Sequence, residues 1–350
     1  MDVDRKCLVA SGKGPTMIFI AGGAGYVGSH TNKRLNMQGY QTVVFDNLVY
    51  GHRDFVRWGE FVLGDLANKD QIRQCFLKYP IDAVMHFSSF AYVGESVSQP
   101  ARYYENNVVN TFNLLEVMRE FQVNNFIFSS TCATYGIPHE IPITEEHPQI
   151  PINPYGKTKL IVEEILKDYD AAYGMKHINL RYFNAAGADP DGEIGERHDP
   201  ETHLIPLAIF AALGIRDEIS IFGTNYPTRD GTCIRDYIHV ADLANAHIIA
   251  FEFLKKTNRS NSFNLGNNKG HTVREILSVV KKITGTGFAI TETERRDGDP
   301  PSLIASNRKA LKMLGWKPQF SGIETIIETA LNWHKRDLSG HAVCSVRNQF

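Results

Sequence analysis

The sequence predicts an α/β protein, with a Rossmann-type doubly wound parallel sheet followed by a smaller mixed α/β C-terminal domain for the substrate. Short apolar runs alternate with longer helical patterns through the first half of the 350-residue chain. This alternation is typical of a parallel sheet with helices on both faces. A glycine-rich segment, Gly22–Gly28, follows the first apolar run and opens the first helical pattern. We therefore expect a ligand at the carboxyl ends of the strands.

The apolar runs of the first half have the composition of buried parallel strands. They are Met17–Ala21, Thr42–Phe45, Ala83–Phe87, Phe126–Ser129 and His177–Arg181. The helical stretches between them are Tyr26–Met37, Asn68–Lys78, Arg102–Glu120 and Tyr155–Tyr173. Each predicted helix therefore connects two predicted strands, as a doubly wound sheet requires.

The regular alternation ends after about Asn184. Residues Gly187 to Pro206 are rich in Gly, Asp, Pro and His, which indicates a long functional loop. Short strands and helices follow, at Ile219–Phe222, Ser262–Leu265, Val273–Ile283 and Ile323–Lys335. We therefore divide the chain into a loose extension (1–16), a cofactor-binding Rossmann domain (17–185), a substrate domain (186–336) and a tail (337–350).

Composition excludes several classes of function. The chain has 37 basic and 39 acidic residues, a net charge of −2 and no charge block, so neither nucleic acid nor an anionic membrane is an expected partner. No apolar run approaches the roughly 20 residues of a membrane span, and no signal peptide precedes Met17. The five cysteines are scattered without a C-x-x-C pair, and the histidines show no ligand spacing. We expect a cytoplasmic protein without a metal.

The glycine segment has the pattern of a dinucleotide-binding turn. Gly22, Gly25 and Gly28 follow a strand and precede a helix, where a tight turn and a helix N-terminus hold a pyrophosphate. Asp46 ends the second predicted strand, close to the spacing of about 20 residues at which an acid bonds the adenosine ribose. A carboxylate there repels a 2′-phosphate, which favours NAD over NADP. Asp65 follows a third strand and is a candidate for the adenine amino group. The alternatives are an ordinary glycine turn and strand-end aspartates.

A tyrosine and a lysine four residues apart supply a candidate base. Tyr155 and Lys159 share one helix face, and a nearby ammonium favours phenolate over phenol. Such a tyrosine beside a nicotinamide is a base for oxidising an alcohol. Thr131, which follows the strand Phe126–Ser129, is placed to bond the reacting oxygen. The alternatives are a solvated helix start and a capping threonine.

Two arginines in the second half are candidate anchors for a second pyrophosphate. Arg235 and Arg296 carry planar guanidinium groups, which bind phosphate through two hydrogen bonds at once. A solvated salt bridge is the alternative interpretation for each.

Motifs spread from Met17 to about Lys335 resemble the UDP-glucose 4-epimerase family of extended short-chain dehydrogenases/reductases. They are Gly22–Gly28, Asp46–Leu48, Gly64–Leu66, Val93–Ser96, Tyr104–Val108, Asn153–Lys157, Arg181–Asn184, Arg235–Val240 and Arg296–Asp299. The resemblance implies a tightly held NAD that is reduced and reoxidised within each turnover. It also implies that Tyr155 takes the sugar 4-OH proton, that the 4-keto sugar rotates about its pyrophosphate link, and that hydride returns to the other face.

The same resemblance implies the residues of each subsite and a homodimer in galactose metabolism. Lys159 holds the nicotinamide ribose and lowers the tyrosine pKa. The cofactor is lined by Gly22, Gly25, Tyr26, Val27, Gly28, Asp46, Asn47, Asp65, Leu66, Phe87, Ser88, Ser89, Asn106, Tyr155, Lys159 and Tyr182. The UDP-sugar is held by Thr131, Asn184, His203, Leu204, Phe222, Arg235, Arg296, Asp299 and Leu303.

Departures from the family pattern leave the sugar open. Ala91 stands where the best-known bacterial members carry a lysine, and His203 where some members carry an asparagine. The stretches Phe90–Gly94 and Thr131–Gly136 look more like UDP-xylose or UDP-arabinose 4-epimerases, and UDP-glucuronate 4-epimerase is a further alternative. At Leu303 some members carry a tyrosine that excludes N-acetylated sugars, so the resemblance implies that the N-acetylated pair is accepted here.

Three other functions compete with epimerisation. One of them, a UDP-glucuronate decarboxylase, has no motif in this sequence that points to it. A sugar-nucleotide 4,6-dehydratase needs an Asp-Glu pair directly after the catalytic threonine, where this chain has Cys132 and Ala133. A catalytically silent NAD-binding regulator commonly lacks the Tyr/Lys pair, which is intact here. Fold alone does not decide between these functions.

Overall fold

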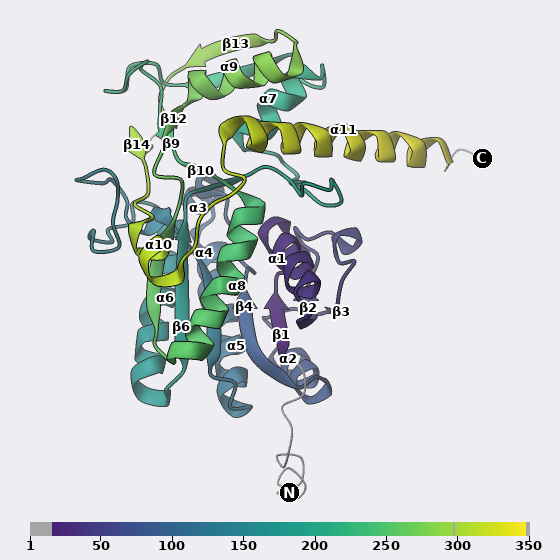
Figure 1. The fold of residues 1–350 in the computed structure, drawn as a ribbon, viewed down its shortest axis with the longest axis vertical. Helices are drawn as coiled ribbons and strands as arrows, with labels where there is room; N and C mark the ends of the chain where they lie inside the picture. The colour runs from purple at the N-terminus through teal and green to yellow at the C-terminus, as the bar shows by residue number, and fades with distance from the viewer. Residues whose placement is uncertain (1–15, 297, 348–350) are drawn as a thin grey trace, which may run out of the picture.

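A computed structural model describes residues 16–296 and 298–347 of the chain, so residues 1–15 of the expected extension lie outside the described part. Within the described residues, seven strands form one parallel sheet (Figure 1). The strands are β1 (Met17–Ala21), β2 (Gln41–Asp46), β3 (Glu60–Leu63), β4 (Ile81–His86), β5 (Asn125–Thr131), β6 (Lys176–Tyr182) and β11 (Asn261–Leu265). Their order is β11-β6-β5-β4-β1-β2-β3, and each neighbouring pair is parallel. The predicted Rossmann-type sheet is confirmed.

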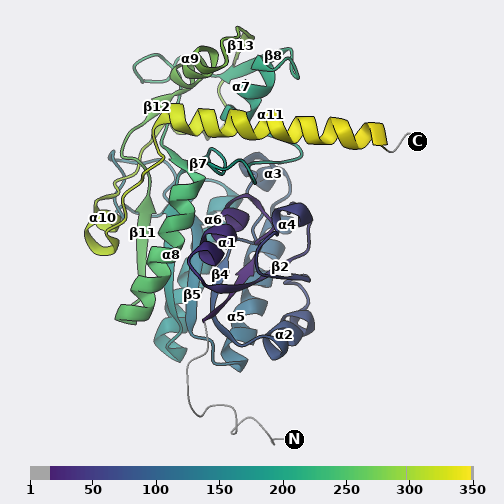
Figure 2. The same ribbon diagram turned by 45° about the vertical axis from the view of Figure 1, so that its right-hand side comes forward.

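Helices cover both faces of this sheet (Figures 1 and 2). One face carries α1 (Tyr26–Met37) and α8 (Val240–Thr257), and the other carries α2 (Lys69–Lys78), α5 (Asn110–Glu120) and α6 (Pro154–Tyr173). In β1, Ile18 and Ile20 pack on the first face and Phe19 packs on the second. Because both faces are covered, the central strands are continuous apolar runs and not alternating ones.

The start of α6 is fixed by its sequence. The side chain of Asn153 accepts a hydrogen bond of 2.8 Å from the Gly156 amide, and Pro154 occupies the first helical position. An Asn cap followed by proline is a strong helix start. The helix ends at Gly174, whose φ of +70° is a left-handed conformation that suits glycine. Tyr155 therefore lies in the first turn of the longest helix that packs on the sheet.

The helix expected at Arg102–Glu120 is interrupted. The structure has α3 (Val93–Ser98), α4 (Pro100–Tyr104), a π-helical turn at Glu105–Val109, and then α5. In the wide turn, the Asn107 side chain accepts a hydrogen bond of 2.9 Å from the Phe90 amide and donates one of 3.0 Å to the Phe90 carbonyl. Such turns are frequent at functional sites, and this one fixes the loop that follows β4.

A smaller group of elements lies beyond the carboxyl ends of the large sheet (Figure 1). It comprises α7 (Leu204–Ala212), β8 (Glu218–Phe222) paired with β13 (Ala289–Thr293), β9 (Ile234–Arg235) between β12 (His271–Thr272) and β14 (Ser302–Leu303), and α9 (Val273–Thr284). The short pair β7 (Asn184–Ala186) and β10 (Tyr237–His239) leads to it and back, and α10 (Arg308–Leu314) and α11 (Ile323–Arg347) follow. Single 3₁₀ turns occur at Arg53–Phe55 and Cys132–Thr134. Apolar side chains of α7, α9 and α11 form the core of this group.

The structure corrects one grouping of segments. The strand expected at Ser262–Leu265, assigned above to the substrate domain, is β11 and extends the large sheet beside β6. The preceding helix α8 packs against α1 on the face of the same sheet. The chain thus leaves the sheet after β6 and later returns to it, which residue patterns do not reveal because a returning parallel strand is as apolar as its neighbours. The domain boundary at 185 stays a prediction, and residues 337–347 of the expected tail continue α11.

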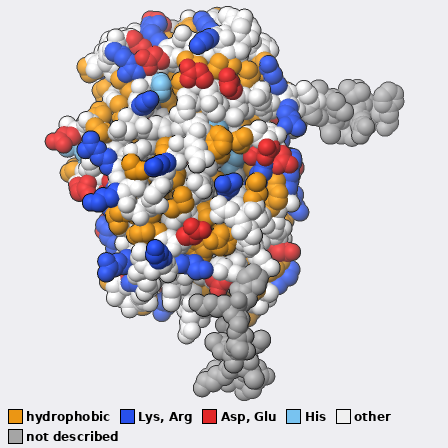
Figure 3. Space-filling model, viewed as in Figure 1, with side chains coloured by type: hydrophobic (Ala, Val, Ile, Leu, Met, Phe, Trp, Pro, Cys, Tyr) orange, Lys and Arg blue, Asp and Glu red, His pale blue; other side chains and the backbone are white. Residues whose placement is uncertain are grey.

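The surface agrees with the charge pattern of the sequence. Figure 3 shows basic and acidic side chains interspersed on one face of the molecule. Among residues 16–296 and 298–347, none of the helices combines the length and apolarity needed to cross a membrane.

Packing between α8 and the sheet can be tested with a matched pair of leucines. Leu254 of α8 is fully buried, whereas Leu77 of α2 is exposed. We expect Leu254→Ala to lower the free energy of unfolding by roughly 2–5 kcal/mol, because it leaves a cavity in the core. Leu77→Ala should change it by no more than about 0.5 kcal/mol. Urea unfolding curves measure both, and equal losses would contradict the packing described here.

Candidate active site

A cavity of about 1550 Å³ lies between the carboxyl ends of the large sheet and the smaller group of elements. It brings together nearly all of the residues that the sequence predicted for cofactor and substrate. Its walls include Gly22, Gly25, Tyr26, Val27, Gly28, Asp46, Asn47, Asp65, Leu66, Phe87, Ser88, Ser89, Asn106, Thr131, Tyr155, Tyr182, Asn184, His203, Leu204, Phe222, Arg235, Arg296, Asp299 and Leu303. Lys159 lies behind the wall, where it contacts the lining residue Ser89.

The turn from β1 to α1 leaves no room for side chains. Gly22 has φ +75°, and a Cβ atom on it would lie 2.5 Å from the Ser88 nitrogen. A Cβ atom on Gly28 would lie 2.3 Å from the Gly22 carbonyl oxygen. Gly25, which has no side chain to cap the helix, directly precedes α1. The turn therefore presents the helix N-terminus to the cavity, and this cradle of backbone amides fits a pyrophosphate.

Two carboxylates mark the end of the cavity beside this turn. Asp46, at the end of β2, accepts hydrogen bonds from the amides of Ala24 (2.9 Å) and Leu48 (2.8 Å). Burial raises the pKa of Asp46, and these backbone hydrogen bonds lower it. Asn47 donates a hydrogen bond of 3.0 Å to Asp65. A fixed carboxylate at this place suits a ribose diol and repels a 2′-phosphate, so the residues fit NAD.

Tyr155 and Thr131 meet in the wall of the cavity. Tyr155 lies in the first turn of α6, and Thr131 is the last residue of β5. Desolvation raises the pKa of Tyr155 well above its ordinary value, the neighbouring Tyr182 raises it further, and a hydrogen bond with Thr131 lowers it. The pKa is therefore raised, whereas the sequence predicted a lowered one, because the effect of burial outweighs the favourable contacts.

Lys159 is buried one helical turn behind Tyr155. Only 3% of its surface is exposed, and its ammonium donates to Ser89 Oγ at 2.8 Å and to the Ser129 carbonyl at 2.7 Å. The ammonium lies 6.0 Å from the centre of the Tyr155 ring. Burial lowers the pKa of Lys159 to about 7, and the negative charge of Glu163 opposes this shift. The protonation state of Lys159 is therefore sensitive to its surroundings near neutral pH.

The two predicted arginines lie in the part of the wall that the smaller group of elements contributes. Arg235 on β9 forms an ion pair with Asp299, and the Arg296 guanidinium lies 3.9 Å from the centre of the Phe222 ring. The ion pair that the sequence left open for Arg235 is thus present. It also fixes the guanidinium in the wall, where its remaining hydrogen-bond donors suit an anionic group.

A cluster that the sequence did not predict surrounds His203. Its ring Nδ1 lies 2.8 Å from Glu196 Oε1 and 2.9 Å from Glu201 Oε1, and His198 Nδ1 lies 3.1 Å from Glu196 Oε1. Desolvation opposes charge on both rings, but the carboxylates raise the pKa of His203 to about 10 and that of His198 to about 9. The sequence signal was the spacing E-x-H-x-x-E-x-H within the long loop.

This cluster bears on the expectation of no metal. One ligand atom from each of its four residues lies within 4.8 Å of the others. A metal requires neutral imidazole, and the carboxylates instead raise the pKa of both rings. The absence of a metal stays a prediction.

Comparisons with known proteins agree with the geometry. A family model described as "NAD dependent epimerase/dehydratase family" matches residues 18–266. A UDP-glucose 4-epimerase of Rhizobium meliloti (strain 1021) is 50% identical over 323 residues, which is 92% of this chain and 98% of that protein. The crystal structure of UDP-glucose 4-epimerase from Brucella ovis in complex with NAD has a TM-score of 0.88 and 51% identity, and covers 90% of this chain and 97% of its own. The UDP-Glc/GlcNAc 4-epimerase of Campylobacter jejuni has a TM-score of 0.81 and 42% identity, with coverage of 92% and 99%.

The glycine turn can be tested by adding one methyl group. In Gly28→Ala the new Cβ meets the Gly22 carbonyl, so the turn must open. We expect dinucleotide affinity to fall at least about tenfold, or about 1.4 kcal/mol. The amount of dinucleotide released when the purified variant is denatured measures the loss. Gly287→Ala is the control, because that glycine is exposed and its Cβ meets no atom within 4 Å. Full dinucleotide content in Gly28→Ala would contradict the assignment.

Proposed function

The chain belongs to the NAD dependent epimerase/dehydratase family, and from this premise we propose that it is a UDP-sugar 4-epimerase that interconverts UDP-glucose and UDP-galactose. One observation carries the proposal. A single cavity is lined by a dinucleotide turn, by Tyr155 and Thr131, and by Arg235 and Arg296. This is the arrangement needed to oxidise and reduce one hydroxyl of a substrate anchored by its diphosphate.

The residues of the large sheet hold the cofactor. The turn Gly22–Gly28 binds the pyrophosphate, Asp46 the adenosine ribose and Asp65 the adenine, while Asn106 and Tyr182 line the nicotinamide end. Bound there, NAD supplies a hydride acceptor that returns the same hydride, so no net redox change occurs.

Tyr155 transfers the proton of the sugar hydroxyl. It takes the proton of the sugar 4-OH, holds it on its phenolic oxygen, and gives it back after the keto sugar has turned about its pyrophosphate link. Thr131 forms a hydrogen bond with the reacting oxygen of the sugar beside Tyr155, and this bond stabilises the charged form of that oxygen. Lys159 places positive charge behind the tyrosine and orients the wall through Ser89.

Binding energy comes from the far end of the substrate. Arg235 and Arg296 hold the diphosphate, while Asn184, Leu204 and Phe222 line the rest of the UDP-sugar. Energy gained from a charged group remote from the reaction can hold an uncharged sugar in either orientation. The proposed roles thus separate substrate affinity from the chemical step, as a reaction at a rotating sugar requires.

Cys132 and Ala133 stand where a sugar-nucleotide 4,6-dehydratase would carry its acid and base. Cys132 is buried next to Thr131, and burial raises the pKa of its thiol to about 12. Ala133 has no titratable group. Neither can serve as the acid and base of a dehydratase. A silent NAD-binding regulator would not need the intact arrangement of Tyr155, Thr131 and Lys159.

Leu303 is proposed to set the size of the accepted sugar. It lies on β14, lines the cavity and packs against Cys132, Phe183 and their neighbours. A leucine leaves room for an acetamide that a tyrosine would fill, so we propose that the N-acetylated pair is also accepted. The homodimer, the place in galactose metabolism and the cytoplasmic location stay predictions.

The base is tested by Tyr155→Phe, which removes only the phenolic oxygen. We expect epimerase activity to fall by about 10²–10⁴-fold while NAD stays bound, because general-base catalysis typically accelerates a reaction by that factor. Tyr173→Phe, at an exposed position on the same helix, should keep full activity. Near-native turnover by Tyr155→Phe would overturn the assignment.

The size of the sugar pocket is tested by Leu303→Tyr. We expect kcat/KM for UDP-N-acetylglucosamine to fall at least about tenfold more than that for UDP-glucose, since steric misfit in a pocket discriminates on this scale. Leu303→Met, which nearly conserves volume, should leave the ratio of the two values unchanged. Equal losses for both sugars in Leu303→Tyr would show that Leu303 only packs.

A further inference from the structure

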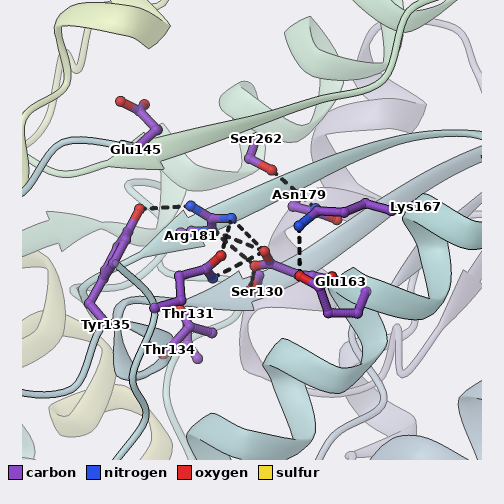
Figure 4. Close-up of polar contacts among 12 residues, drawn as sticks. Ser130, Thr131, Thr134, Tyr135, Glu145, Glu163, Lys167, Asn179, Arg181 and Ser262 are labelled. Carbon is purple, nitrogen blue, oxygen red and sulfur yellow. Dashed lines mark hydrogen bonds and ion pairs between the residues drawn. The ribbon is translucent and has the colours of Figure 1, made fainter. Parts of the chain in front are cut away.

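Figure 4 shows a network of polar contacts between side chains of β5, β6 and α6, including Ser130, Glu163 and Arg181. At its centre, Arg181 of β6 and Glu163 of α6 form an ion pair, with side-chain exposures of only 4% and 0%. Arg181 Nε lies 3.0 and 3.2 Å from the two carboxylate oxygens of Glu163, and Nη2 lies 2.5 Å from Oε2. Ser130 donates to Oε1 at 2.5 Å, and Gln149 donates to Oε2 at 3.2 Å. The carboxylate is therefore fixed from three separate segments of the chain.

The other side of Arg181 is fixed as well. Its Nη1 donates to the Tyr135 hydroxyl at 2.9 Å, and Nη2 donates to Gln149 Oε1 at 3.0 Å. Tyr135 in turn donates to Asn264 Oδ1 at 2.7 Å, on β11. The network thus ties α6 to strands β5, β6 and β11.

Two members of the network, Glu163 and Ser130, lie close to the catalytic residues along the chain. Tyr155, Lys159 and Glu163 follow each other at intervals of four residues, so they lie on one face of α6. Ser130 directly precedes Thr131 at the end of β5. A shift of Glu163 would therefore move the helix that carries the base and the strand that carries its hydrogen-bond partner.

Stability alone does not explain a charged pair at this place. Removing two charges from water costs several kcal/mol per ion, and well-packed apolar residues commonly replace such pairs without loss. Instead, Glu163 lies one helical turn beyond Lys159, and its hydrogen-bond partner Ser130 lies next to Thr131. This position points to a role in the reaction.

We propose that Glu163, fixed by Arg181, is a positioning residue that aligns Tyr155 with Thr131 and keeps Lys159 in its ammonium form. The inference rests on the proposed epimerase function and deepens it, because it assigns the network behind the active site to the same reaction. Glu163 touches neither the cavity nor the reacting atoms, and it acts through Lys159 and Ser130.

The charges around Lys159 define what Glu163 contributes. On its own helix Lys159 faces Tyr155 and Glu163, and His86 faces it from the end of β4. Burial and, to a smaller extent, the positive charge of Lys159 lower the pKa of His86 to about 3, so His86 is neutral. The ammonium also contacts Ser89 Oγ, the Ser129 carbonyl and, at 4.8 Å from its centre, the Phe128 ring, which are all uncharged. Glu163 is therefore the acidic group that opposes the effect of burial on the pKa of Lys159.

Glu163→Gln tests the proposal in the holoenzyme. Without the negative charge the pKa of Lys159 falls further, so the ammonium is lost at lower pH. We expect the alkaline fall of kcat to move to lower pH by roughly one unit, the lower end of the range for an adjacent opposite charge. Ser130→Ala, which removes one hydrogen bond and keeps both charges, should reduce kcat without moving that pH. A wild-type pH profile in Glu163→Gln would overturn the proposal.

A second variant separates the charge effect from instability, because Glu163→Gln leaves Arg181 buried without its partner. Glu163→Gln with Arg181→Met removes both charges and should fold. Its pH profile should also move to lower pH. An unshifted profile, or failure of the double variant to fold, would assign the pair to stability alone and overturn the proposal. If the wild-type protein does not epimerise UDP-sugars, the proposed function itself fails, which is a different outcome from an unshifted profile.

Discussion

Close contact between the backbone after β1 and the backbone after β4 is the constraint on which the site depends. The Phe87 amide donates to the Ala21 carbonyl at 2.7 Å, and the Gly22 amide donates to the Phe45 carbonyl at 3.0 Å. The ends of three adjacent strands are thereby joined, and Gly22 has to be glycine because Ser88 occupies the place of its side chain. The helix N-terminus, the carboxylate of Asp46 and the loop after β4 are therefore held together at one edge of the sheet.

At this edge of the sheet, burial shifts the pKa values of Tyr155 and Lys159 in opposite directions. Burial raises the pKa of Tyr155 and lowers that of Lys159, because it disfavours the charged form of each. The protein opposes both shifts with one group each, Thr131 for the tyrosine and Glu163 for the lysine. The two groups are linked through Ser130, which precedes Thr131 in β5 and donates a hydrogen bond to the carboxylate of Glu163. Groups with shifted pKa values are common in active sites, and here the supporting shell is itself buried and ordered.

The second wall of the cavity comes from segments that leave the sheet. The long loop after β7 is held at its start by Tyr26, whose hydroxyl donates to the Gly187 carbonyl at 2.5 Å. It then carries the pairs of histidine and glutamate that surround His203. The loop therefore links the cofactor side to the substrate side, and it places two histidines paired with two glutamates in the wall of the cavity.

The sequence by itself determined the parallel sheet, the glycine turn, the pair Tyr155 and Lys159, and the family, because local periodicity and short motifs carry that information. Only the tertiary structure decided the rest. It placed β11 back in the large sheet, opened the helix before α5 into a π-helical turn, and joined Glu163 to Arg181 across two elements. The spacing of His198 and His203 to Glu196 and Glu201 is present in the sequence, but the burial that shifts their pKa values is not. Burial and long-range contacts set the other features, and neither is written in the spacing of residues along the chain.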